Sequence, residues 1–125
     1  MTIYIASSSP PVVNAVHRLV VLQRPYVAVY ADCGRVVPLV ANGTLTGILY
    51  LDIASCNSSL EALLQTITSN TLLLQSVAIV LIGDRRLLSS PEQHLLSTLS
   101  LPVLPFPFTD GDFVNLLNTL LLRFP

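Results

Sequence analysis

Short apolar runs alternate along the chain with longer stretches in which apolar residues recur at helical spacing. The runs are four to six residues long and rich in β-branched or aromatic residues, which is typical of strands. Five strands are predicted on this basis: Thr2 to Ala6, Tyr26 to Ala31, Ile48 to Leu51, Val77 to Ile82 and Pro102 to Phe106.

The stretches between and after these runs predict five helices. A serine and proline cluster at residues 7–11 favours a helix start, because serine oxygens cap free amides and proline fits the first turn. Ser58 or Ser59 is expected to cap the third helix and Asp110 the last one. The helical segments run from Val12 towards Pro25, from Arg35 to Ala41, from Leu60 to Ile67, from Pro91 to Leu99 and from Phe113 to Leu121.

The alternating order predicts one α/β domain over residues 1–125, with a doubly wound, flavodoxin-like (βα)5 fold. The third and fourth strands are apolar at successive positions, which indicates a parallel sheet covered by helices on both faces. With right-handed crossovers, the expected strand order is 2-1-3-4-5. The functional crevice of such a sheet lies at the carboxyl ends of its first and third strands, where this chain has Ser7, Ser8 and Asp52.

The composition of the chain argues against several classes of function. Hydrophobic residues make up 52% of the chain and charged residues 10%, with a net charge of −1. There is no lysine, so any mechanism that needs a lysine ammonium is excluded, and the chain has no basic stripe of the kind that nucleic-acid binding requires. Neither a signal peptide nor a membrane-spanning run is expected, so a cytoplasmic location is predicted. Cys33 and Cys56 lack metal-site spacing and are expected to be thiols in a reducing compartment.

Three segments resemble the receiver domain of two-component response regulators. Residues 3–10, Ile-Tyr-Ile-Ala-Ser-Ser-Ser-Pro, are similar to its first strand, which places two acidic residues before serine and proline. Leu49 to Ile53 resembles its third strand, which ends in the phospho-acceptor aspartate at the position of Asp52. Leu104 to Thr109 resembles its fifth-strand motif, lysine-proline-phenylalanine. The resemblance implies a signalling domain that spans the whole chain.

The chain departs from the receiver pattern at the positions that bind metal. In the family, the acidic pair and the acceptor aspartate hold a magnesium ion during phosphoryl transfer. Ser7 and Ser8 stand at the acidic positions, which leaves Asp52 as the carboxylate of the site. Because hard cations need several oxygen ligands and concentrated negative charge, no metal or other cofactor is expected, and Mg²⁺ would bind Asp52 only weakly.

The other working positions of a receiver are also altered. Phe106 stands at the lysine position, and Ile82 or Gly83 at the position of the hydroxyl that contacts the phosphoryl group. Val103 falls where an aromatic switch residue is expected. Since phosphoryl transfer needs these groups assembled together, conventional phosphorylation is not expected.

The remaining polar residues offer few alternatives. Asp52 is expected to accept hydrogen bonds from Ser7, Ser8 or nearby loop amides. Asp32 and Asp84 follow neighbouring strands, and Asp84 is expected to form a turn beside Arg85 and Arg86. His17 and His94 lie inside predicted helices, so a serine nucleophile lacks a base and no enzymatic activity is expected.

The last helix carries more apolar residues than one buried stripe requires, and its interaction face is predicted from Phe113, Leu117, Leu120 and Leu121. We therefore predict a degenerate, receiver-like signalling domain that acts by protein contact, as a homodimer or with a sensor kinase or output protein. The first alternative is an atypical receiver that is phosphorylated on Asp52 in a phosphorelay, with Mg²⁺. The second is a small anion-binding module at Ser7 to Ser9, where serine hydroxyls and free amides meet a helix start.

Overall fold

A five-stranded parallel sheet forms the centre of the computed structural model, which describes residues 2–22, 27–31 and 33–122. The strand order is β2-β1-β3-β4-β5, so the predicted fold class and topology are confirmed. The predicted element ends at Pro25 and Tyr26, and the candidate Asp32, lie outside the described residues. The strands are β1 (Thr2–Ala6), β2 (Val27–Ala31), β3 (Gly47–Asp52), β4 (Val77–Ile82) and β5 (Val103–Leu104).

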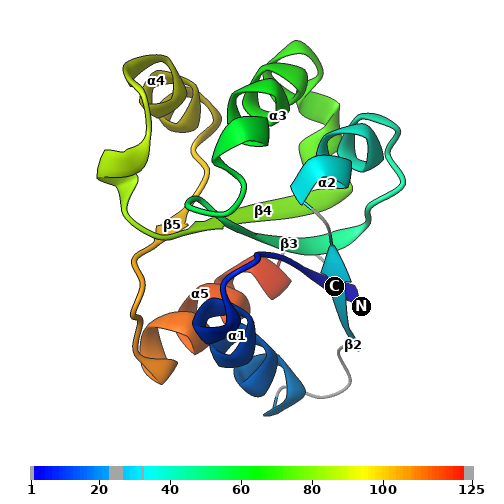
Figure 1. Cartoon of the computed structure of the whole chain (residues 1–125). Helices are drawn as coiled ribbons and strands as arrows, with labels where there is room; N and C mark the ends of the chain where they lie inside the picture. Colours follow the sequence, from blue (N-terminus) through cyan, green and yellow to red (C-terminus); the bar gives the residue numbers. More distant parts are fainter. Residues whose placement is uncertain (1, 23–26, 32, 123–125) are drawn as a thin grey trace.

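Helices cover both faces of the sheet. Figure 1 shows α1 and α5 on one face and α2, α3 and α4 on the other. Two short 3-10 helices, η1 and η2, flank β4 in the chain. The bounds are α1 (Pro10–Leu22), α2 (Cys33–Ala41), α3 (Asn57–Ser69), η1 (Thr71–Gln75), η2 (Arg85–Leu87), α4 (Ser90–Leu99) and α5 (Asp110–Leu121).

The two central strands explain why the sequence gives this layered fold. Every residue of β3 and β4 is buried, as the apolar runs at 48–51 and 77–82 predict, and the burial extends to Asp52 at the end of β3. Successive side chains point to opposite faces of the sheet: Leu49 and Leu51 pack towards α2, α3 and α4, whereas Ile48 and Tyr50 pack towards α1 and α5. The sheet therefore separates two apolar cores.

Helix α5 belongs to the second core, and the interaction face predicted on it is wrong. Phe113, Leu117 and Leu120 are buried, and Leu121 is partly buried against the same core. The phenyl ring of Phe113 stacks on Tyr50, with 5.1 Å between ring centroids. These apolar residues fill the layer between the sheet and α5 instead of forming a surface.

The starts of two helices also differ from the prediction. Thr109 caps α5 by accepting a hydrogen bond from the amide of Asp112, so Asp110 is not the cap. The carboxylate of Asp110 instead pairs with Arg18 on α1, at 3.0 Å. Helix α3 begins at Asn57, and the residue at its cap position is Cys56, so the predicted cap positions 58 and 59 both lie inside the helix.

A disulfide between Cys33 and Cys56 corrects the expectation of two thiols. Cys33 is the first residue of α2, and Cys56 directly precedes α3. Although β1 lies between β2 and β3 in the sheet, the chain segments after those two strands meet on the face that α2 and α3 cover. Their Cα atoms are 5.1 Å apart.

Tyr50 carries a buried polar group that the fold does not satisfy. Its hydroxyl has no hydrogen-bond partner in the part of the chain that the structure describes. Burial raises the pKa of this phenol above its ordinary value. Above about pH 10, the unfolded chain therefore releases this proton before the folded chain does, and folding stability declines.

We expect Tyr50→Phe to raise the free energy of unfolding by about 1 kcal/mol, because it removes an unsatisfied buried hydroxyl and keeps the ring. The same substitution is expected to flatten the fall in stability above about pH 10. Urea unfolding of both proteins at neutral and alkaline pH measures both effects. A Tyr50→Phe variant that is less stable than the parent would show that the hydroxyl has a hydrogen-bond partner in solution.

None of the helices within the described ranges has the length and apolar character needed to cross a membrane.

Candidate functional site

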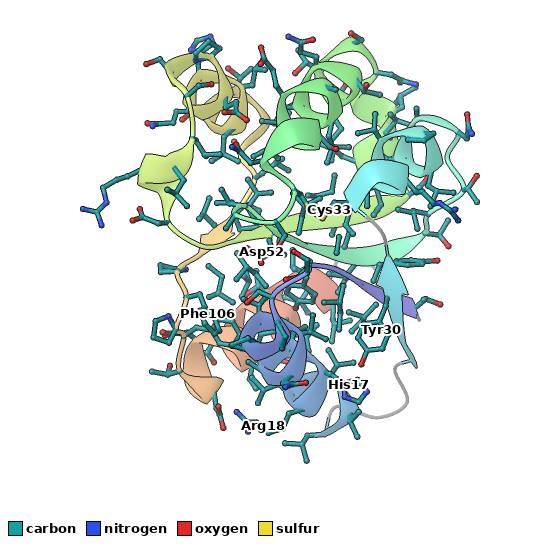
Figure 2. The ribbon with its side chains drawn as sticks, in the orientation of Figure 1. His17, Arg18, Tyr30, Cys33, Asp52 and Phe106 are labelled. Atoms are coloured by element: carbon teal, nitrogen blue, oxygen red, sulfur yellow. A yellow bond between two sulfur atoms is a disulfide. The ribbon has the colours of Figure 1, made fainter. Side chains whose placement is uncertain are left out.

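The carboxyl ends of β1 and β3 bring the predicted crevice residues together. Ala6 lies opposite Leu51 in the β1–β3 register, so Ser7 and Asp52 follow at the same edge of the sheet. Figure 2 shows Asp52 near the middle of the molecule, between the two helical layers. Its side chain is 4% exposed, which makes it one of two buried acidic side chains within the described residues.

Asp52 is held by three hydrogen bonds, two of which come from hydroxyls. Ser7 Oγ donates to Asp52 Oδ2 at 2.7 Å, and Ser55 Oγ donates to the same oxygen at 2.8 Å. The backbone amide of Ala54 donates to Oδ1 at 3.1 Å. Hydrogen bonds to a carboxylate are stronger than neutral ones, so these donors offset the cost of burying the charge. The predicted contact with Ser7 and a loop amide is confirmed.

Ser8 joins this arrangement through Ser55 and does not contact Asp52 directly. The hydroxyl and the backbone amide of Ser8 both approach Ser55 Oγ, at 3.1 and 3.0 Å. We refer to Ser7, Ser8, Asp52 and Ser55 as the serine–aspartate cluster. It connects the loop after β1 to the loop after β3 by side-chain hydrogen bonds.

The cluster opposes an anion site at Ser7 to Ser9. An anion at a helix start is held by free backbone amides. Here the amide of Ser8 donates to Ser55, and the amide of Ser9 donates to Ser7 Oγ at 3.0 Å. The nearby Asp52 carboxylate would also repel an anion. Two of the amides that the anion-binding alternative needs are therefore already engaged.

The cluster does not fit a magnesium ion. A carboxylate offers about four lone-pair sites, and three of those on Asp52 already accept hydrogen bonds. The hydroxyls of Ser7 and Ser55 both donate to Asp52 Oδ2, so a cation at that oxygen would have to displace these hydrogen bonds. No group of three or more His, Cys, Asp or Glu side chains with metal-site geometry occurs in the described ranges.

The other positions that the resemblance marks carry side chains unsuited to a phosphoryl group. Ile82, the last residue of β4, is buried, and Phe106 is exposed beyond β5. Gly83 has φ +131°, a backbone conformation that L side chains rarely adopt. A hydroxyl could therefore not be placed at residue 83 without backbone strain.

Asp84 forms the predicted turn, and neither histidine lies at a strand end. The carboxylate of Asp84 accepts hydrogen bonds from the guanidinium of Arg86 and, with a smaller effect, from its amide, and these hold the pKa of Asp84 below the ordinary value. His17 is exposed on α1, where its ring lies 6.0 Å from that of Tyr30, and His94 is exposed on α4.

Ser55 is the member of the cluster that was not predicted. The turn after β3 brings it back over the strand end, since the amide of Cys56 donates to the carbonyl of Asp52. An aspartate whose side chain accepts the amide two residues later is a common turn. The available signal was therefore the spacing Asp-Ile-Ala-Ser, which places a hydroxyl three residues after the carboxylate.

The fold is that of CheY-like response-regulator receiver domains. The structure matches a receiver domain protein of Methanospirillum hungatei with a TM-score of 0.67 and 21% identity, over 91% of this chain and 88% of that one. It also matches a Burkholderia pseudomallei protein named as pilus assembly-related, with a TM-score of 0.71 and 17% identity, over 98% and 90% of the two chains. A third match is the pilus assembly protein CpaE2 of Sinorhizobium meliloti, with a TM-score of 0.63 and 17% identity, over 94% and 98%.

The likeness to these proteins is one of structure. No family model matches the sequence, and no curated protein sequence matches it. Identities below 25% show a shared fold and leave the activity to be argued from the residues themselves.

Proposed function

We propose that this chain is a receiver-like signalling domain that acts by protein contact and without phosphorylation. The observation that carries the proposal is the state of the Asp52 carboxylate, which accepts hydrogen bonds from Ser7, Ser55 and Ala54. A phospho-acceptor oxygen must attack phosphorus while a cation offsets the charge that develops. Here the attacking oxygens are engaged by protein donors, and the residues around them do not suit a cation.

Two further residues support this proposal. Phe106 supplies an apolar ring where a lysine would offset the charge of a phosphoryl group. Gly83 cannot donate a side-chain hydrogen bond, and its positive φ disfavours the residues that could. A phosphoryl group on Asp52 would therefore lack both of its usual stabilising contacts.

The proposal assigns the domain no enzymatic activity and no cofactor. We propose that it works in the cytoplasm, as a homodimer or with a sensor kinase or output protein. Because two of the similar structures belong to proteins named for pilus assembly, a component of such an assembly is a further candidate partner. The few charged residues and the net charge of −1 support a protein partner over a nucleic acid.

We expect acetyl phosphate with Mg²⁺ to leave the chain unmodified, because Asp52 lacks the groups that stabilise the transferring phosphoryl group. Intact-protein mass spectrometry, run beside the Methanospirillum hungatei receiver domain under the same conditions, measures incorporation. Beryllofluoride is expected to produce no shift of the Asp52 amide resonance.

The matched variant is Asp52→Asn, which keeps the shape of the side chain and removes the acceptor. A phosphoryl group that appears on the parent and disappears in this variant would establish the alternative, an atypical receiver that is phosphorylated on Asp52. Labelling that persists in Asp52→Asn would place the phosphoryl group elsewhere on the chain and would contradict the expectation that the chain stays unmodified.

A further inference from the structure

The disulfide between Cys33 and Cys56 presents its two halves unequally to solvent. Cys33 is the first residue of α2 and is partly exposed, whereas Cys56 is 0% exposed and belongs to the core that α2 and α3 cover. Figure 2 shows Cys33 at the start of α2. A thiolate breaks a disulfide by attacking one of its sulfur atoms, and access helps to decide which one. A thiol that arrives from solvent therefore meets Cys33 first.

A hydrogen-bond acceptor lies ready for the thiol form of Cys56. Cys56 Sγ is 3.4 Å from the carbonyl oxygen of Ala6, the last residue of β1. A disulfide sulfur has no hydrogen to donate, whereas a thiol is a weak donor. This contact therefore becomes a hydrogen bond only when the bond to Cys33 is broken. The fold accommodates Cys56 both as one half of a disulfide and as a buried thiol.

The backbone holds Cys56 in place whether or not the disulfide is intact. The amide of Cys56 donates to the carbonyl of Asp52 at 2.9 Å, so the turn after β3 does not depend on the cross-link alone. Cys33 lies on the solvent side of the bond, and Arg35, two residues later in α2, is exposed. A group attached to Cys33 would therefore alter the surface at the start of α2 and leave the loop of the serine–aspartate cluster in position.

We propose that the Cys33–Cys56 disulfide is a thiol-exchange site, at which a low-molecular-weight thiol becomes attached to Cys33 and Cys56 acts as the resolving thiol. The incoming thiolate attacks Cys33 Sγ and forms a new sulfur–sulfur bond with it. The bond between the two cysteines breaks, and its electron pair leaves with Cys56 Sγ, which takes a proton from water. Each exchange replaces one disulfide by another, so the incoming thiol is the only co-reactant besides that proton.

The reverse step restores the internal disulfide. The Cys56 thiolate attacks Cys33 Sγ, and the small thiol leaves with the electron pair of the mixed disulfide. The exchange uses no atom of the serine–aspartate cluster, so it goes beyond the proposed function and does not rest on it. It gives the domain a chemical input that does not pass through Asp52 and that changes a surface available for protein contact.

Trapping the mixed disulfide on the full chain tests this assignment. The oxidised chain is incubated with reduced glutathione, the exchange is stopped with acid, and free thiols are blocked with N-ethylmaleimide in denaturant. Peptide mapping by mass spectrometry should then find about tenfold or more glutathione on Cys33 than on Cys56, because buried cysteines react slowly. The same chain unfolded in urea is the control, and there glutathione should appear on both cysteines to a similar extent.

Two single variants form a matched pair, with circular dichroism to verify that each is folded. Oxidised glutathione should modify Cys56→Ala, which keeps the partly exposed thiol, about tenfold or more faster than Cys33→Ser, which keeps the buried one. Glutathione found mainly on Cys56 of the folded parent would overturn the assignment. So would a folded parent whose disulfide resists glutathione that opens it in the urea-unfolded chain, or cysteines that stay thiols in oxidised glutathione. The acetyl phosphate test is separate from all of these results.

Discussion

Truncation of Phe113 to alanine is expected to lower the free energy of unfolding by about 3–5 kcal/mol. The phenyl ring is fully buried between α5 and the sheet, where it stacks on Tyr50 and lies 5.5 Å from the ring of Phe108. Removing it leaves a cavity that the neighbouring rings cannot fill, and it ends two aromatic contacts. For a domain whose total stability is of the order of 5–15 kcal/mol, this is a large fraction.

Urea unfolding followed by circular dichroism measures the change. Leu122→Ala is the matched control, because this leucine follows α5 and its side chain is 84% exposed. Its effect should stay within about 0.5 kcal/mol. A Phe113→Ala protein that keeps the stability of the parent but loses self-association would restore the interaction face that the sequence predicted on α5.

The number of apolar residues in α5 does not reveal whether they are buried or exposed. A helix that packs against a sheet and a neighbouring helix buries a wider stripe than one that packs at a single line of contact. Phe113, Leu117 and Leu120 all lie in that stripe, and α1 lies beside α5 on the same sheet face. The width of the stripe depends on where α1 packs, and that information is absent from the α5 sequence.

The bounds of a strand were easier to predict where burial on both faces alone determines its residue types. β4 has the predicted bounds, Val77 to Ile82, because a strand with helices on both faces is apolar at every position. β5 is two residues long instead of the predicted five, and proline flanks it at both ends. The cap of α5 was misplaced by one residue, because threonine and aspartate both cap helices. Thr109 has the extended backbone of a cap, whereas Asp110 is the first residue of the helix and pairs with Arg18.

Sheet topology made part of the candidate site predictable. Ser7 and Asp52 meet because β1 and β3 are parallel neighbours and their ends share one edge. Ser55 depends on the path of a loop, and the disulfide depends on two segments that meet across β1. Neither relation has a signal in hydrophobic periodicity, which is why both were missing from the prediction.

The disulfide closes a covalent loop around the site. Cys33 and Cys56 are 23 residues apart, and the enclosed segment contains α2, β3 and Asp52. A cross-link of this span restricts the unfolded chain and stabilises the fold by about 3 kcal/mol on the chain-entropy account. Disulfides are rare in reducing compartments, where those that form are usually transient or redox-sensing. If the domain works in the cytoplasm, oxidation or reduction of these two cysteines would change its free energy of unfolding.

We expect reduction of the parent protein to lower its free energy of unfolding by about 3 kcal/mol. Urea unfolding with and without a phosphine reductant measures the loss, and mass spectrometry after thiol alkylation confirms the redox state. The double variant Cys33→Ser with Cys56→Ala has no cross-link and should have the same stability with and without the reductant. If the parent is equally insensitive although its bond has been reduced, the packing of α2 and α3 alone holds the two segments together, and the cross-link adds no stability to the folded domain.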